Sequence, residues 1–231
     1  MASSTAKRFA PLRPRPGDSH LDLPRLRGIV FDMDGTLCEP QTYMFGEMRS
    51  HLKIPKSVDI LQHIDSLPPP DQAAAHQAIC DIETRAAALQ VPQPNLALLM
   101  AHLDARALPK AICTRNFDGP VRALLAKFLP PDTLFSPIIT RHFRPAKPHP
   151  AGILHIAAQW GLPDASGLIM VGDSIDDMTA GRRAGAATVL LANNVNGQLF
   201  DHRDTDLVIH RLDQLIDILD DGFQGREIAA S

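Results

Sequence analysis

Six side chains in four short segments have the chemistry needed to bind a hard cation and a phosphoryl group. They are Asp32 and Asp34, Thr114, Lys147, and Asp173 and Asp177. Carboxylates are preferred ligands of hard cations, and hydroxyl and ammonium groups bind phosphoryl oxygens. Each segment also has a structural explanation, since Asp34-Gly35 could form a turn and Ser174-x-x-Asp177 resembles a helix capping box. The combination predicts one site rather than four unrelated features.

The segments that carry these side chains lie at the ends of predicted buried strands. Continuous apolar runs occur at 28–31, 110–113, 134–139, 167–171, 188–191 and 207–209. The sequences between most of these runs have the periodicity of amphipathic helices. This alternation is typical of an α/β, Rossmann-like protein in which helices cover both faces of a mainly parallel sheet. Ligands bind at the carboxyl ends of such strands, where the six side chains are expected to converge.

Changes in composition and in hydrophobic periodicity divide the chain into three parts. Residues 24–40 and 93–231 carry the strand and helix alternation and form the predicted α/β core. Residues 41–92 are Ala-rich with a helical pattern, and we interpret them as a small all-helical subdomain. Residues 1–23 are basic and Pro-rich and are predicted to be a disordered tail.

The ordered set of segments resembles the haloacid dehalogenase superfamily. The four motifs are Phe31-Asp-Met-Asp-Gly-Thr, Ile112-Cys-Thr-Arg-Asn, Lys147-Pro and Val171-Gly-Asp-Ser-Ile-Asp-Asp. The first and fourth are specific together, whereas the second and third carry little information alone. One departure is His149, where relatives often carry Asp. The resemblance implies that residues 41–92 are a helical cap inserted between the first and second motifs.

The resemblance also implies catalytic roles. Asp32 would be the nucleophile that forms an aspartyl phosphate, and Asp34 would protonate the leaving oxygen and later deprotonate the attacking water. Thr114 would hydrogen-bond a phosphoryl oxygen, and Lys147 would neutralise charge on the nucleophile and the transferring group. Two carboxylates are needed because one of them becomes covalently occupied.

The implied cofactor is Mg²⁺. Its ligands would be the carboxylate of Asp32, the backbone carbonyl of Asp34, and the side chains of Asp173 and Asp177. We favour Asp177 over its neighbour Asp176, because positions 173 and 177 share a face of the predicted helix, while position 176 lies about 100° away from 177.

The implied function is a Mg²⁺-dependent phosphatase acting on a small phosphorylated metabolite. A phosphomutase would use the same aspartyl phosphate but return the phosphoryl group to a rebound intermediate. A receiver-like signalling module would also combine acids, Thr and Lys on a parallel sheet, but Gly-Thr after the acceptor and an inserted cap are not expected there.

The cap is expected to be a mobile lid that determines substrate choice. We hypothesise that polar residues of its first helix face the substrate's non-phosphate end: Arg49, His51 or Lys53. We interpret three arginines near the motifs as surface cations rather than substrate ligands: Arg115, Arg141 and Arg144.

Composition narrows the remaining function classes. Lys and Arg number 23 and Asp and Glu 26, so the basic excess typical of nucleic-acid binding is missing. No apolar run approaches the roughly 20 residues of a membrane span. Three widely spaced cysteines suggest neither disulfides nor zinc. These features favour a cytoplasmic protein with no nucleic-acid or membrane partner, although the basic N-terminus is also compatible with a mitochondrial transit peptide.

Overall fold

The core of the protein is a parallel sheet, as predicted. The computed structural model describes residues 6–13 and 22–227, and its six-stranded sheet has the order β3-β2-β1-β4-β5-β6 with every neighbouring pair parallel. The strands are β1 (Gly28–Phe31), β2 (Lys110–Cys113), β3 (Ile138–Ile139), β4 (Leu168–Gly172), β5 (Ala187–Leu191) and β6 (Leu207–Ile209). The predicted α/β class with a mainly parallel sheet is confirmed.

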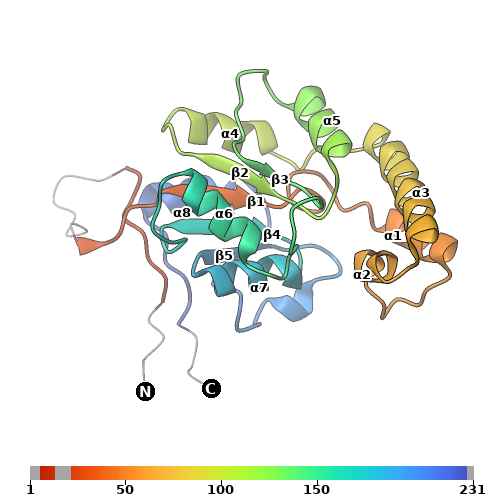
Figure 1. The fold of residues 1–231 in the computed structure, drawn as a ribbon. Coiled ribbons are helices and arrows are strands. Elements are labelled where there is room, and N and C mark those ends of the chain that lie inside the picture. The colour runs from red at the N-terminus through yellow and green to blue at the C-terminus, as the bar shows by residue number, and fades with distance from the viewer. Residues whose placement is uncertain (1–5, 14–21, 228–231) are drawn as a thin grey trace, which may run out of the picture.

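Helices cover both faces of this sheet (Figure 1). They are α4 (Leu96–Asp104), α5 (Asp118–Phe128), α6 (Ala151–Gln159), α7 (Ile175–Ala184) and α8 (Gln214–Asp221). Successive strand residues point to opposite faces. Ile29 and Phe31 therefore pack with residues of α4, α5 and α8, whereas Val30 packs with residues of α6 and α7.

Residues 41–92 form three helices with a core of their own. These are α1 (Thr42–Leu52), α2 (Ile60–Asp65) and α3 (Pro69–Ala88), and their inward side chains make a separate apolar cluster that includes Met48, Ile64 and Ile79. Helix α3 starts at Pro69. Proline has no backbone N–H, and it is tolerated here because the first N–H groups of a helix have no acceptor within the helix. Figure 1 shows the three helices to one side of the sheet, next to α5.

Two connections join this helical subdomain, called the cap from here on, to the core. They run side by side: the N–H of Glu39 donates to the carbonyl of Val91 at 2.8 Å, and the N–H of Gln93 donates to that of Leu37 at 3.0 Å. An antiparallel bridge links Cys38 and Pro92. The cap is therefore held by a two-stranded tether at the end of the sheet where β1 finishes.

The third predicted strand was too long. We expected residues 134–139, but only Ile138–Ile139 are extended and paired, and Leu134 is 72% exposed. Prolines precede this stretch at positions 130 and 131 and interrupt it at 137, and a proline cannot donate to a sheet ladder. Backbone hydrogen bonds to β2 begin at Ser136, whose N–H donates to the carbonyl of Lys110 at 2.8 Å, but the strand itself is confined to the two residues after Pro137.

The prediction of a disordered tail is wrong for residues 6–13, whereas the parts of the tail at 1–5 and 14–21 lie outside the described residues. Phe9 is 2% exposed and packs 5.7 Å from the ring of Phe223. Its N–H donates to the carbonyl of Phe223 at 2.9 Å. Burial of this one aromatic ring, together with backbone pairing to the C-terminal segment, orders a stretch whose composition favours disorder.

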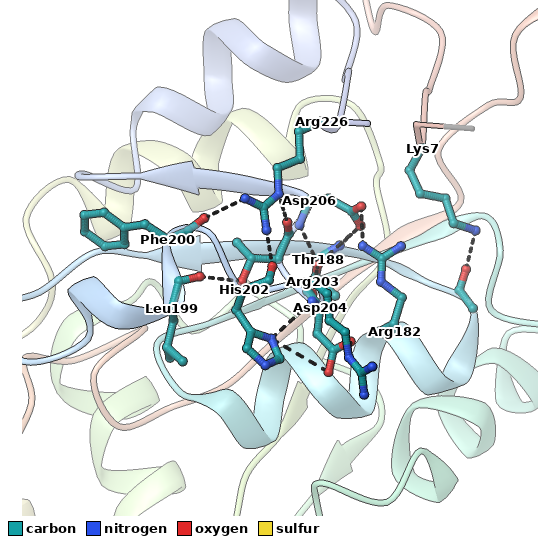
Figure 2. A network of polar contacts seen from close by, with 12 residues as sticks. Lys7, Arg182, Thr188, Leu199, Phe200, His202, Arg203, Asp204, Asp206 and Arg226 are labelled. Atoms are coloured by element: carbon teal, nitrogen blue, oxygen red, sulfur yellow. Dashed lines mark hydrogen bonds and ion pairs between the residues drawn. The ribbon is translucent and has the colours of Figure 1, made fainter. Parts of the chain in front are cut away.

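A buried polar network ties the same end of the core together (Figure 2). Asp206, which precedes β6, is 1% exposed and accepts hydrogen bonds from the backbone N–H of Thr188 at 2.9 Å and from Arg182 at 2.6 Å. The guanidinium of Arg226 donates to the carbonyls of Phe200 and Thr205 at 3.1 and 2.7 Å. This amino-end network, defined as Arg182, Thr188, Asp206 and Arg226, lies at the start of β5 and β6.

Within residues 6–13 and 22–227, the structure contains no helix long and apolar enough to cross a membrane.

Candidate active site

The first two candidate acids follow β1 at the opposite end of the sheet. The N–H of Asp32 donates to the carbonyl of Val171 at 2.9 Å and so extends the β1–β4 ladder by one residue. Beyond it the chain turns sharply through Gly35, whose φ is +84°. A Cβ at Gly35 would also collide with the carboxylate of Asp173. Glycine at this turn therefore lets the β1 and β4 ends approach each other.

Lys147 lies between two of the acids. Its Nζ is 2.6 Å from Oδ1 of Asp32 and 2.5 Å from Oδ1 of Asp177, and the residue is 6% exposed. Burial opposes its charged form, but the carboxylates of Asp177 and Asp32 outweigh burial and raise the pKa of Lys147 above its ordinary value. The lysine is thus held as a cation inside the site.

The start of α7 positions Asp177. Ser174 and Asp177 form a capping box: the N–H and Oγ of Ser174 donate to Oδ2 of Asp177 at 3.0 and 2.6 Å. Asp177 is fully buried. Asp176 instead turns towards Arg115, 2.5 Å away. Ser174-x-x-Asp177 is therefore a helix capping box, as its sequence suggested. The same hydrogen bonds orient Asp177 so that its other oxygen, Oδ1, faces Lys147.

Three of the predicted metal ligands lie close enough to share one cation. One carboxylate oxygen from each of Asp32, Asp173 and Asp177 lies within 4.8 Å of the others. Burial, helped by the neighbouring carboxylates and opposed by Lys147, raises the pKa of Asp32 to about 7 and that of Asp173 to about 8. An all-oxygen donor set with this surplus of negative charge fits a hard divalent cation such as Mg²⁺.

The end of β2 supplies polar groups on the other side of Asp34. Thr114 is 4% exposed, and its Oγ1 accepts the N–H of Asn116 at 3.0 Å. The side-chain amide of Asn116 donates to Oδ2 of Asp34 at 2.9 Å. Burial raises the pKa of Asp34 even though this hydrogen bond opposes the shift. A carboxyl group whose pKa is raised in this way is better suited to donate a proton than an ordinary aspartate.

The sequence analysis missed two asparagines that hold the acids. Asn116 binds Asp34, and Asn193, just after β5, donates to Oδ2 of Asp173 at 2.9 Å. Both lie within a few residues of a strand end that faces the site. Asn116 is the last residue of the second motif, whereas Asn193 had no indication beyond an amide side chain in a loop, and many loops contain one.

A cavity of about 280 Å³ lies between these strand ends and the cap. Its core walls include all six predicted side chains. From the cap, Met44, Met48 and Ile79 contribute apolar surface, and Glu83 contributes a buried carboxylate. Of the three cap residues expected to face a substrate, Arg49 lines the cavity, whereas His51 and Lys53 do not among the described residues.

Ion pairs hold the cap against the core. Arg115 pairs with Asp59 at 2.5 Å, Arg144 pairs with Asp65 at 3.1 Å, and Arg141 pairs with Glu83. The interpretation of Arg141 as a surface cation is wrong, because the residue is only 3% exposed. Burial raises the pKa of Glu83 to about 7, with Arg141 opposing the shift.

Comparisons with known proteins agree with this arrangement. A family model for haloacid dehalogenase-like hydrolases matches residues 26–185. The uncharacterized hydrolase YOR131C of Saccharomyces cerevisiae is 43% identical over 202 residues, which cover 85% of this chain and 92% of that protein. The phosphoglycolate phosphatase of Haemophilus influenzae is 31% identical over 128 residues, or 54% of this chain and 56% of that protein.

Solved structures show the same fold. The crystal structure of a predicted phosphoglycolate phosphatase from Haemophilus somnus superimposes with a TM-score of 0.65 at 19% identity, covering 84% of this chain and 97% of that one. The family match decides against a receiver-like signalling module. With a family model that covers most of its length and a relative at 43% identity, this chain belongs to the haloacid dehalogenase-like hydrolases.

Proposed function

We propose that this protein is a Mg²⁺-dependent phosphatase that hydrolyses a small phosphorylated metabolite through an aspartyl phosphate on Asp32. One observation carries the proposal: Asp32 is buried against Lys147 and beside Asp173 and Asp177, at the floor of a cavity of about 280 Å³. A volume of this kind suits a small ligand rather than a polymer. Similarity to phosphoglycolate phosphatases supports the same reaction class.

In the first step, a carboxylate oxygen of Asp32 attacks phosphorus and the bond from phosphorus to the ester oxygen breaks. Lys147 opposes the rise in the pKa of Asp32 and so favours the ionised form of the attacking carboxylate. Asp34, whose pKa burial raises, gives its proton to the leaving oxygen. Thr114 donates a hydrogen bond to a phosphoryl oxygen. The products of this step are the free alcohol and the aspartyl phosphate.

In the second step, Asp34 takes a proton from a water molecule, which attacks the aspartyl phosphate. The bond from phosphorus to the Asp32 oxygen breaks, so inorganic phosphate leaves and the carboxylate is restored. Asp32, Asp173 and Asp177, with the backbone carbonyl of Asp34, would hold Mg²⁺. When bound, the ion would offset the repulsion between the carboxylate and the phosphate.

The direct test is to trap the intermediate. Protein incubated with a ³²P-labelled aryl phosphate and Mg²⁺, then quenched in acid, should carry label that hydroxylamine releases and that maps to Asp32. The Asp32→Asn variant should carry none. Label on another residue, or turnover by the variant within tenfold of wild type, would contradict the proposal. A sugar phosphate has a second hydroxyl that can accept the phosphoryl group, so its recovery as an isomerised ester instead of inorganic phosphate would identify a phosphomutase.

A further inference from the structure

The cavity contains one cation that has no carboxylate partner. Among the described residues that line it, Lys147 pairs with Asp32 and Asp177, and Arg115 pairs with acids on both the cap and α7. Arg49, in the last turn of α1, lines the same cavity and forms no ion pair in the part of the chain that the structure describes.

The acids of the cap do not compensate Arg49. Glu83 is paired with Arg141, and Asp59 is paired with Arg115. Each of these two acids is therefore matched by a core arginine, which leaves Arg49 as a cation without an acid among the described cap residues that line the cavity.

Arg49 also has an unused buried hydrogen-bond donor. Its Nη1 donates to the carbonyl of Phe45, one turn earlier in α1, at 3.3 Å, and its charge lies in the last turn, where the helix dipole favours a cation. Its Nε, however, is buried and has no partner. A buried donor without an acceptor is unfavourable, and an incoming acceptor removes that penalty. The position of Arg49 in the last turn of α1 accounts for its positive charge but not for its buried, unpaired Nε.

We propose that Arg49 binds a second anionic group of the substrate, at the end opposite the phosphoryl group that is transferred. The inference rests on the proposed phosphatase function and narrows its substrates to phosphomonoesters that carry a further carboxylate or phosphate. A guanidinium presents paired donors that match both groups. Met44, Phe45 and Met48 line the cavity beside Arg49 and offer apolar surface to a short carbon chain.

Binding of stable analogues tests this inference without turnover. We would measure, by calorimetry with Mg²⁺ present, the affinity of alkylphosphonates of two to six carbons whose far end is a methyl, a carboxylate or a second phosphonate. At one or more chain lengths, wild type should bind an anionic tail at least tenfold more tightly than the methyl tail. The length that binds best measures the span to Arg49, and the two anionic series distinguish a carboxylate from a second phosphate.

Two variants test whether Arg49 causes the preference for an anionic tail. Arg49→Gln should remove the preference for the anionic tail and change the affinity for the methyl tail less than threefold. Arg85→Gln is the matched control, because Arg85 is a cap arginine that pairs with Glu47 and is not among the described residues that line the cavity. It should keep the wild-type preference.

The outcomes separate this inference from the proposed function. Equal affinity for methyl and anionic tails at every length in wild type overturns the role of Arg49 alone. An equal loss for both tails in Arg49→Gln also overturns it, since Arg49 would then bind the transferred phosphoryl group. If no phosphonate binds at all, the proposed function fails and this inference fails with it.

Discussion

The two ends of the sheet hold two buried polar clusters that differ in charge balance. At the amino end, the carboxylate of Asp206 meets the guanidinium of Arg182 at 2.6 Å and is held by Thr188. At the carboxyl end, four carboxylates share one lysine. This acidic cluster is defined as Asp32, Asp34, Asp173, Asp177 and Lys147.

In the acidic cluster, the carboxylates outnumber the cations that could pair with them. In the acidic cluster, burial raises the pKa of Asp32 to about 7 and that of Asp173 to about 8. A buried charge is tolerated when it is paired, as in the amino-end network, and is unfavourable when it is not. One end of the sheet is thus arranged for stability, and the other keeps unneutralised charge for a cation and a substrate.

The largest expected effect comes from removing the nucleophile. Asp32→Asn should lower turnover of an aryl phosphate by at least about 10³-fold, equivalent to about 4 kcal/mol, because the amide is not an anionic nucleophile. Its Tm should equal or exceed that of wild type, since one of four crowded carboxylates becomes neutral. Phosphate release and thermal unfolding measure the two effects. A clear fall in Tm would mean that the acidic cluster stabilises the fold.

The opposite result is expected in the amino-end network. Asp206→Ala should lower the free energy of unfolding by about 3 kcal/mol, because it leaves Arg182 and the N–H of Thr188 without their buried acceptor. Turnover at 20 °C should stay within twofold of wild type. Urea unfolding and steady-state kinetics would measure both. The contrast between the two ends would be lost if Asp206→Ala left stability unchanged or reduced turnover tenfold.

The acidic cluster was largely predictable, because strand ends in a parallel sheet must meet at one edge. Asp32, Lys147 and Asp177 are distant in sequence yet close in the structure, as strand order requires. The preference for Asp177 over Asp176 agrees with where their side chains point. The catalytic and metal roles of these residues stay predictions.

Contacts that depend on the cap were not predictable. Whether Arg141 is a surface cation or a buried partner of Glu83 depends on how α3 lies over the core, and no local pattern encodes that position. Phe9 posed a similar problem, since one aromatic residue in a basic, Pro-rich stretch gives no periodicity. In both cases burial is decided by a distant partner.

A pH dependence of stability should follow from the raised carboxyl pKa values. In the folded, metal-free protein, Asp32 and Asp173 hold protons up to about pH 7 and 8, whereas in the unfolded chain they lose them near 3.8. The folded state therefore binds more protons over this range, and the free energy of unfolding falls as pH rises. We expect a loss on the order of 4 kcal/mol between pH 6 and 8.

Adding Mg²⁺ tests whether these carboxylates cause the fall in the free energy of unfolding with pH. The ion should raise Tm more at pH 8 than at pH 6, because it binds the ionised carboxylates. Asp173→Asn should show a smaller slope without metal and a smaller shift with it. A metal-free protein whose stability rises from pH 6 to 8 would contradict the raised pKa values.

The smallest effect is expected at an exposed pair between cap and core. Arg144 and Asp65 are 3.1 Å apart, and both side chains are 44% exposed, so water screens their attraction. Arg144→Ala should lower the free energy of unfolding by less than about 1 kcal/mol and change turnover less than twofold. Arg122→Ala is the matched control, because Arg122 is an exposed arginine that pairs with Asp118 within α5 and forms no ion pair with the described residues of the cap. Urea unfolding and kinetics of the two variants should agree within error. If Arg144→Ala alone reduced turnover several-fold, exposed charge would hold the cap over the acidic cluster, and burial would not be what separates strong pairs from weak ones in this protein.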